Sequence, residues 1–213
     1  MICPICGKRA AKRFCPAKGE KICAICCGTE RERTIDCPAD CAYLIKAHRY
    51  ETEHRAPPSR DEFPYPDIEF PVEFVYERWA VVTGLANTMT GFQSQHRDLV
   101  DGLANQALSS LAEAYHTLES GIYYENPPVH PVARELYAQL GNFLQEFRKG
   151  EKNRAGFSSL KYSDIFRLLV FLLRISKQES NGRPLSRAFL AFLRERFTVR
   201  AASEAEAPRI IVP

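Results

Sequence analysis

Long hydrophobic runs are missing from this 213-residue chain. Its longest apolar stretch, Leu168 to Leu173, is six residues long and is bounded by Arg167 and Arg174. That is far short of the roughly 18 apolar residues that cross a bilayer. The opening Met-Ile-Cys-Pro also lacks the basic stretch and apolar core of a signal peptide. We therefore expect no membrane association and a cytoplasmic location, where thiols stay reduced.

Cysteine is absent after Cys41, so all eight cysteines are crowded between Cys3 and Cys41. In a secreted mini-protein this crowding would indicate disulfides, but here there is no export signal and the cysteine-free remainder is long. Metal binding is the better interpretation. The hydrophobic fraction of 45% and the charged fraction of 26% are typical of globular proteins and argue against wholesale disorder.

The cysteine spacing predicts tetrahedral metal sites. Two residues between thiolates let the chain curl around one ion, and a glycine after each knuckle, Gly7 and Gly28, relieves the tight turn. Pro38 suits the first turn of a helix, so we expect Cys37 and Cys41 to face one side of a helix N-terminus, which favours thiolate over thiol. Eight sulfurs fill two closed four-sulfur sites, typical of structural zinc, and we predict two zinc ions. The predicted ligands are Cys3, Cys6, Cys15, Cys23, Cys26, Cys27, Cys37 and Cys41.

These ligand pairs, with the Arg-Phe-Cys-Pro stretch at Cys15, resemble the small MYND and HIT zinc fingers, and a knuckle joined to a helix N-terminus resembles a treble clef. Those families use four pairs and often end in His, whereas Cys15 stands alone here. A cross-braced outline implies one ion on Cys3, Cys6, Cys23 and Cys26 and another on Cys15, Cys27, Cys37 and Cys41. The division of Cys23, Cys26 and Cys27 between the ions stays open, as does replacement of a ligand by His48 or His54. The resemblance also implies a protein-interaction role.

The chain as a whole resembles bacterial proteins that join such a finger to a helical domain with Thr117–Gly121 and Asn181-Gly182-Arg183 motifs. That resemblance implies no activity.

Three other interpretations of the cysteines are weaker. Buried cysteines without metal do not come as knuckles followed by glycine. An iron–sulfur cluster fits the atoms, but the compact run of a ferredoxin is missing. A redox switch at Cys26-Cys27 has no further support. A module of about 50 residues is too small to fold on its own apolar core, and each zinc site contributes on the order of 10 kcal/mol of apparent folding free energy.

The predicted fold class is mainly α, with a small N-terminal zinc-binding module followed by a bundle of about five helices. The module spans residues 1–55, a stiff proline-rich linker spans 56–71, the bundle spans 72–200, and a loose tail spans 201–213. Apolar residues recur at helical spacing in each predicted helix. The helices are expected over 72–90, over 99–122, from Pro131 to about 147, after an N-cap at Ser163, and from Pro184 to about 197.

The charge distribution supports two opposite interpretations. Residues 1–60 carry 12 basic and 7 acidic side chains, but eight thiolates and two zinc ions would reduce the net charge to about +1. Lys8-Arg9, Lys12-Arg13 and Arg31/Arg33 either form a basic patch or compensate the sulfur sites. A basic set in the last helices either binds an acidic partner or nucleic acid, or packs against the acidic residues 61–130. Its members are Arg174, Lys177, Arg183, Arg187, Arg194, Arg196 and Arg200.

No residue pattern in the sequence indicates a catalytic site. Glu113 and His116 have the Glu-x-x-His spacing of di-iron bundles, but only one copy is present, and we expect surface residues. No phosphate loop, dinucleotide fingerprint or nucleophile elbow occurs. The leading hypothesis is therefore a non-enzymatic protein-interaction or adaptor module with two structural zinc ions. The alternative is a nucleic-acid-binding regulator that uses the finger and the basic C-terminal helices.

Overall fold

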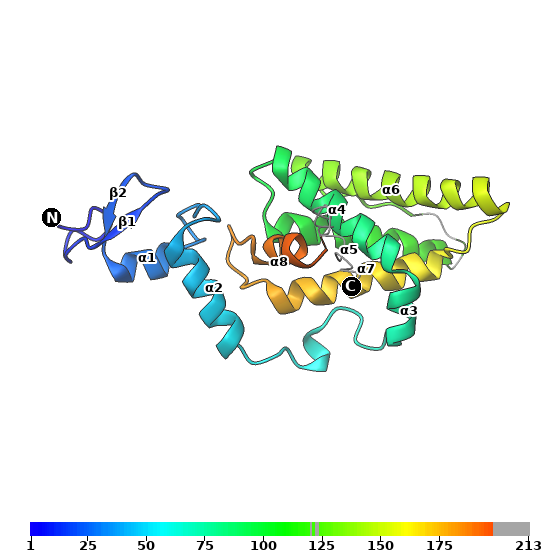
Figure 1. The fold of residues 1–213 in the computed structure, drawn as a ribbon, viewed down its shortest axis with the longest axis horizontal. Helices are drawn as coiled ribbons and strands as arrows, with labels where there is room; N and C mark the ends of the chain where they lie inside the picture. The colour runs from blue at the N-terminus through cyan, green and yellow to red at the C-terminus, as the bar shows by residue number, and fades with distance from the viewer. Residues whose placement is uncertain (120, 122–123, 198–213) are drawn as a thin grey trace, which may run out of the picture.

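A computed structural model describes residues 1–119, 121 and 124–197, and the predicted tail and Arg200 lie outside this range. The mainly helical fold class is confirmed, with a small strand-containing region that carries the cysteines (Figure 1). None of the described helices is both long enough and apolar enough to cross a membrane.

The N-terminal part, residues 1–55, which we call the finger, has its own small core. A two-stranded antiparallel hairpin, β1 (Arg13–Cys15) and β2 (Glu20–Ile22), leads into the short helix α1 (Ala24–Glu30) and then the longer helix α2 (Ala42–His54). Besides cysteines, the residues buried in this core are few, namely Ala11, Ile22 and Ile35. So little apolar burial is consistent with a module that depends on another source of stability.

The remaining helices form the bundle, around a core separate from that of the finger. Helix α5 (Asp101–Glu119) packs against both α6 (Pro131–Ala155) and α7 (Tyr162–Glu179), while α4 (Trp79–Gln95) lies between α6 and α8 (Ala188–Phe197) (Figure 1). Leucine and other aliphatic side chains on the facing stripes are fully buried, which is the main stabilising term for such a bundle.

The first predicted helix, over residues 72–90, is divided in the structure. It forms two helices, α3 (Val72–Glu77) and α4. The described part of the bundle therefore contains six helices, one more than the five expected from the sequence. Arg78 leaves helical geometry, with φ −104° and ψ 14°. Its guanidinium donates to Asp164 of α7 at 3.2 Å and to the carbonyl of Ser159, just before α7, at 3.3 Å, and these contacts hold the residue where the helix breaks.

Two predicted helix starts are wrong. Ser163 lies inside α7, which begins at Tyr162 after Lys161; the Lys161 amide donates to the Asp164 carboxylate at 3.4 Å. Pro184 precedes α8 by several residues, because the chain from Ser180 to Arg187 is held in a loop by contacts with the finger.

Residues 56–71 do not run free between the two parts. They contain a 3₁₀ turn, η1 (Arg60–Glu62), and then lie along α7. Arg174 of α7 donates to the carbonyl oxygens of Pro64 and Tyr65, and Arg167 donates to that of Glu69 at 2.7 Å. The proline-rich segment is thus held by side chains of the bundle and not only by its own stiffness.

The loop between α7 and α8, residues 180–187, fixes the finger to the bundle, and we call it the docking loop. Asn181 Nδ2 donates to the Glu32 carboxylate at 2.8 Å, and the Leu185 amide donates to the Glu32 carbonyl at 2.9 Å. Arg183 Nη1 donates to the carbonyl of Arg31 at 3.0 Å, and Arg183 Nη2 lies 3.3 Å from the carboxylate of Glu51. The docked side of the finger is therefore the segment from Gly28 to Asp36 together with α2.

Candidate metal centre

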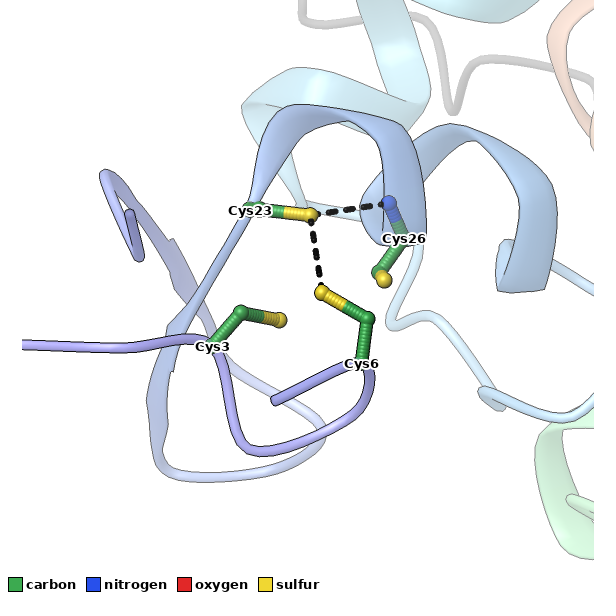
Figure 2. Close-up of side chains that lie close together, drawn as sticks. All are labelled: Cys3, Cys6, Cys23 and Cys26. Carbon is green, nitrogen blue, oxygen red and sulfur yellow. Dashed lines mark hydrogen bonds between the residues drawn. The ribbon is translucent and has the colours of Figure 1, made fainter. Parts of the chain in front are cut away.

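Four sulfurs meet at the end of the finger that lies away from the bundle. The loop at the N-terminus supplies Cys3 and Cys6, and the start of α1 supplies Cys23 and Cys26, all pointing toward one another (Figure 2). Their sulfur atoms lie within 4.8 Å of one another, and those of Cys6 and Cys23 are 4.0 Å apart. These are the four residues that the sequence predicts for one ion.

Local structure explains why the four side chains converge. Gly7 has a positive φ of 62°, which lets the chain turn back after Cys6, and the Gly7 amide donates to the Cys3 carbonyl at 2.8 Å. Cys23 is the N-cap of α1, and its sulfur accepts a hydrogen bond from the Cys26 amide at 3.3 Å. The hairpin places this helix start opposite the loop of Cys3 and Cys6.

A knuckle facing a helix N-terminus is thus present, but at a different pair from the one expected. The helix end is that of α1 at Cys23, whereas Cys37 and Pro38 lie outside α2, whose N-cap is Cys41. Gly28 is also not the turn residue that the sequence suggested, because it lies inside α1. A helix of only seven residues follows Cys23, and its apolar positions were too few to be predicted from periodicity.

The spacing of the sulfurs fits one tetrahedral ion. Zinc–sulfur bonds of about 2.3 Å place tetrahedral sulfurs about 3.8 Å apart. A disulfide needs about 2.05 Å, and all eight cysteines are free thiols. An iron–sulfur cluster places several irons and sulfides between its cysteines, which requires a wider opening than this group offers. This cluster can therefore hold a metal ion through four sulfurs.

The thiols of the cluster differ in pKa. Backbone amides of Lys8 and Arg9 donate toward Cys6 and lower its pKa to about 6. Hydrogen bonding to Cys23, with burial, raises the pKa of Cys26 to about 12. Metal binding at this cluster must therefore displace a proton from Cys26 at neutral pH.

Arg9 belongs to the Lys8-Arg9 pair, for which the sequence left open a basic patch or compensation of the sulfur sites. Interaction with the Cys23 side chain, together with the charges of Cys6, Cys23 and Cys26, raises the pKa of Arg9. A cation in this place compensates a four-thiolate site, whose charge with one divalent ion is about −2. For Arg9, the interactions with these cysteines favour the second of the two interpretations, compensation of the sulfur site.

The other four cysteines are not gathered as closely. Within the described residues, no second group of three or more ligand atoms meets the same 4.8 Å limit. Cys15 and Cys41 are buried, and the pKa of Cys37 is raised by burial and by the charges of Cys41 and Cys15, so both lie within electrostatic range of Cys37. Cys27 accepts a contact from Arg31 Nη2 at 4.0 Å. The second zinc site stays a prediction.

Neither histidine joins the cluster. His48 Nε2 lies 2.9 Å from Glu32 Oε2, and His54 stacks on Tyr50 of its own helix. Glu32 is 2% exposed and has a positive φ of 52°. Burial opposes its ionisation, but bonds from His48 and Asn181 and the charge of Arg183 outweigh burial and lower its pKa. No sequence motif marked this carboxylate.

A cleft of about 660 Å³ lies between the finger and the bundle. The finger contributes apolar side chains to it, including Leu44 and Ile45, and the bundle contributes Arg97, Arg187 and Arg194. Several polar groups of the cleft bind each other: His48 binds Glu32, Arg187 binds Asp36, and Arg194 binds Gln93.

The basic residues of the last helices mostly have intramolecular partners. Arg174, Arg183, Arg187 and Arg194 all donate to carbonyls, carboxylates or amides of the chain. Their partners lie mainly in the finger, the linker and α4, and Glu51 and Asp36 are the acidic ones. His116, proposed as one half of a lone Glu-x-x-His pair, stacks on Phe166 with ring centroids 4.5 Å apart, and Glu113 is exposed.

Comparison with known protein families, curated proteins and solved structures finds no match to this chain. The functional argument therefore rests on the site itself.

Proposed function

We propose that this protein is a non-enzymatic interaction module whose finger is held in shape by structural zinc. The observation that carries the proposal is the convergence of four cysteine sulfurs within 4.8 Å of one another. Four thiolates complete a tetrahedral shell and leave no open position for a substrate or water, which is typical of structural sites. The metal would supply the folding free energy that the small finger core lacks.

We further propose a second zinc ion on Cys15, Cys27, Cys37 and Cys41. The charges of Cys41 and Cys15 that act on Cys37 support it, as does the packing of Cys27 and Cys37 against the finger core. Such an ion would draw together the two ends of the segment that docks on the bundle, because Cys27 and Cys37 flank it. The two sites would then be interleaved along the chain.

A protein partner is the first candidate for what the module binds. The cleft between the finger and the bundle supports this, since it pairs an apolar wall with Arg97, an exposed arginine. Aliphatic and arginine side chains at the edge of a preformed cleft are compatible with a protein interface. Nucleic acid is the second candidate. The intramolecular roles of Arg174, Arg183 and Arg187 weigh against the C-terminal helices as its binding surface.

Metal analysis of protein purified without added zinc tests the proposal. We expect about two zinc ions per chain, lowered by one in Cys6→Ser and by one in Cys41→Ser. Cys41→Ser should also speed hydrogen exchange around the second site, in residues 37–54, while the bundle helices stay protected. Ala10→Ser, at an exposed finger position, is the control and should keep the full metal content.

The possible results separate the parts of the proposal. Absence of any bound metal from reduced protein, with a rigid finger, would refute it. One zinc that is lost in Cys6→Ser and kept in Cys41→Ser would refute only the second site.

A further inference from the structure

The positive charge of the finger is concentrated at its tip, residues 1–23. This segment carries six basic side chains and one acidic one. A four-thiolate site with one zinc ion would leave it with a net charge of about +3. The near-neutral charge of the whole finger therefore hides a basic tip. Figure 1 shows this tip projecting away from the bundle.

The hairpin sorts the tip residues onto two faces. Cys15 and Ile22 are buried on the inner face, where Arg13 also lies over the ring of Tyr43 at 4.8 Å. Because side chains alternate along a strand, Lys12 and Phe14 point to the opposite, outer face. Phe14 pairs directly with Lys21 on β2, so these two side chains are neighbours on that face.

All members of the outer face are exposed. Phe14 is 53% exposed, and Ile2, which pairs with Ala10 beside the hairpin, is 66% exposed. Lys12 and Lys21 are exposed, and no carboxylate lies within ion-pair distance of either in the described part of the chain. Compensation of the sulfur site accounts for Arg9 but not for these lysines. An aromatic ring between unpaired cations is left facing solvent.

We propose that this outer face binds single-stranded nucleic acid, with Phe14 stacking on a base while Lys12 and Lys21 contact phosphates. Single strands present flat bases that an aromatic ring can stack on, together with phosphates that lysines neutralise. A folded duplex hides its base faces and would leave Phe14 unused. The inference rests on the proposed function, because the hairpin keeps its shape only if the metal holds Cys3, Cys6, Cys23 and Cys26 together.

Fluorescence anisotropy with a labelled oligothymidylate of about 20 nucleotides tests the proposal on the full zinc-loaded chain. We expect binding at about 50 mM salt that weakens steeply by about 200 mM. The double variant K12E/K21E should bind at least about tenfold more weakly, with a shallower dependence on salt because two phosphate contacts are lost. Phe14→Ala should weaken binding about tenfold through the lost stacking.

Lys46→Glu is the matched control, since Lys46 is an exposed lysine on α2, outside the tip. It makes the same charge change as each tip substitution and should alter affinity by less than about threefold. Zinc content is measured on every variant to show that the finger stays folded.

Several results would overturn the inference. Zinc-loaded protein that fails to bind the oligonucleotide at about 50 mM salt would remove it while leaving the structural zinc role intact. Lys46→Glu makes half the charge change of K12E/K21E, so a loss of half as much binding free energy in Lys46→Glu would show that only overall charge matters. An unchanged affinity in Phe14→Ala would rule out base stacking, and tighter binding to polyglutamate than to the oligonucleotide would identify an acidic protein as the partner. Loss of zinc itself would point to failure of the proposed function instead.

Discussion

Arg183 binds the carbonyl oxygen of Arg31 at 3.0 Å, across 152 positions of sequence. The same guanidinium lies 3.3 Å from the carboxylate of Glu51, so one bundle side chain joins both the docked segment and α2 of the finger. The finger is thus part of a fixed assembly and does not swing on a free linker.

Removal of the Arg183 guanidinium should loosen this assembly. In Arg183→Met, loss of the two charge-assisted contacts should lower the free energy of unfolding by about 1–3 kcal/mol, measured by denaturant titration. Hydrogen exchange should accelerate in residues 28–36 and 180–187, while zinc content stays unchanged. Arg196→Met, at an exposed position of α8, is the control and should change neither quantity. Equal protection of the docked segment in both variants would contradict the assigned role of Arg183.

Zinc affinity should depend on pH with a defined sign. Because the pKa of Cys26 is about 12, binding at neutral pH must release its proton, so apparent affinity should rise about tenfold per pH unit from this group alone. Below about pH 6 the Cys6 thiolate also takes up a proton, and the dependence should become steeper. Competition with a chromophoric chelator over pH 5.5 to about 8.5 measures this slope. Affinity that is constant across this range would show that the four thiols are already ionised.

Asp101 should be a main determinant of where α8 begins. Its carboxylate accepts bonds from the amides of Phe189 and Leu190 at 3.2 Å and from Ser186 at 2.8 Å, and so caps α8 from the neighbouring helix. Asp101→Ala leaves these donors unpaired in a buried site and should cost about 2–4 kcal/mol of stability.

Asp101→Asn should cost less, because an acceptor remains and burial already raises the pKa of Asp101, which marks the charge as costly there. Asp98→Ala, at an exposed position, is the control for both changes. Thermal denaturation followed by circular dichroism orders the three variants, and equal midpoints for Asp98→Ala and Asp101→Ala would contradict the capping role.

Gly84 allows α4 and α6 to approach closely. A Cβ atom at this position would lie 2.0 Å from Cζ of Phe143, so Gly84→Ala forces the ring or the helix to move. Overpacking costs about 1–3 kcal/mol, which exceeds the gain of about 1 kcal/mol in helix propensity.

When Phe143 is already alanine, Gly84→Ala should show its gain in helix propensity, so that G84A/F143A is more stable than Phe143→Ala, since the ring that blocks the methyl group is gone. Gly91→Ala in the same helix has open space and is the control, expected to be neutral or stabilising. If denaturant titration found Gly84→Ala as stable as Gly91→Ala, the close packing against Phe143 would be disproved.

The metal cluster was predictable because knuckle chemistry is local. Cys3 and Cys6, like Cys23 and Cys26, are separated by two residues, a spacing typical of a turn around one ion, and the structure brings these same four together. The helical class was predictable for a similar reason, since apolar stripes have to face one another to be buried.

Features set by distant contacts were not predictable. The break at Arg78 depends on Asp164, and the late start of α8 depends on contacts of the docking loop with Glu32. Glu32 gave no signal in the sequence, because its partners His48 and Asn181 lie far from it along the chain and meet it only in the folded protein. The predictions from Pro38 and Gly28 were wrong. Proline is common in the first turn of a helix and glycine in a tight turn, but here Pro38 lies before α2 and Gly28 lies inside α1.

Because Glu32 and Asn181 lie far apart along the chain, the finger is synthesised well before the loop that anchors it to the bundle. Asn181, which binds the finger, is synthesised 149 residues after Glu32, whose carboxylate it binds. At about 5–20 residues per second, the nascent finger spends roughly 7–30 s without its bundle. Over that interval, captured metal would be what protects it from proteases and chaperones, so cellular zinc supply would act on this protein before its translation is finished.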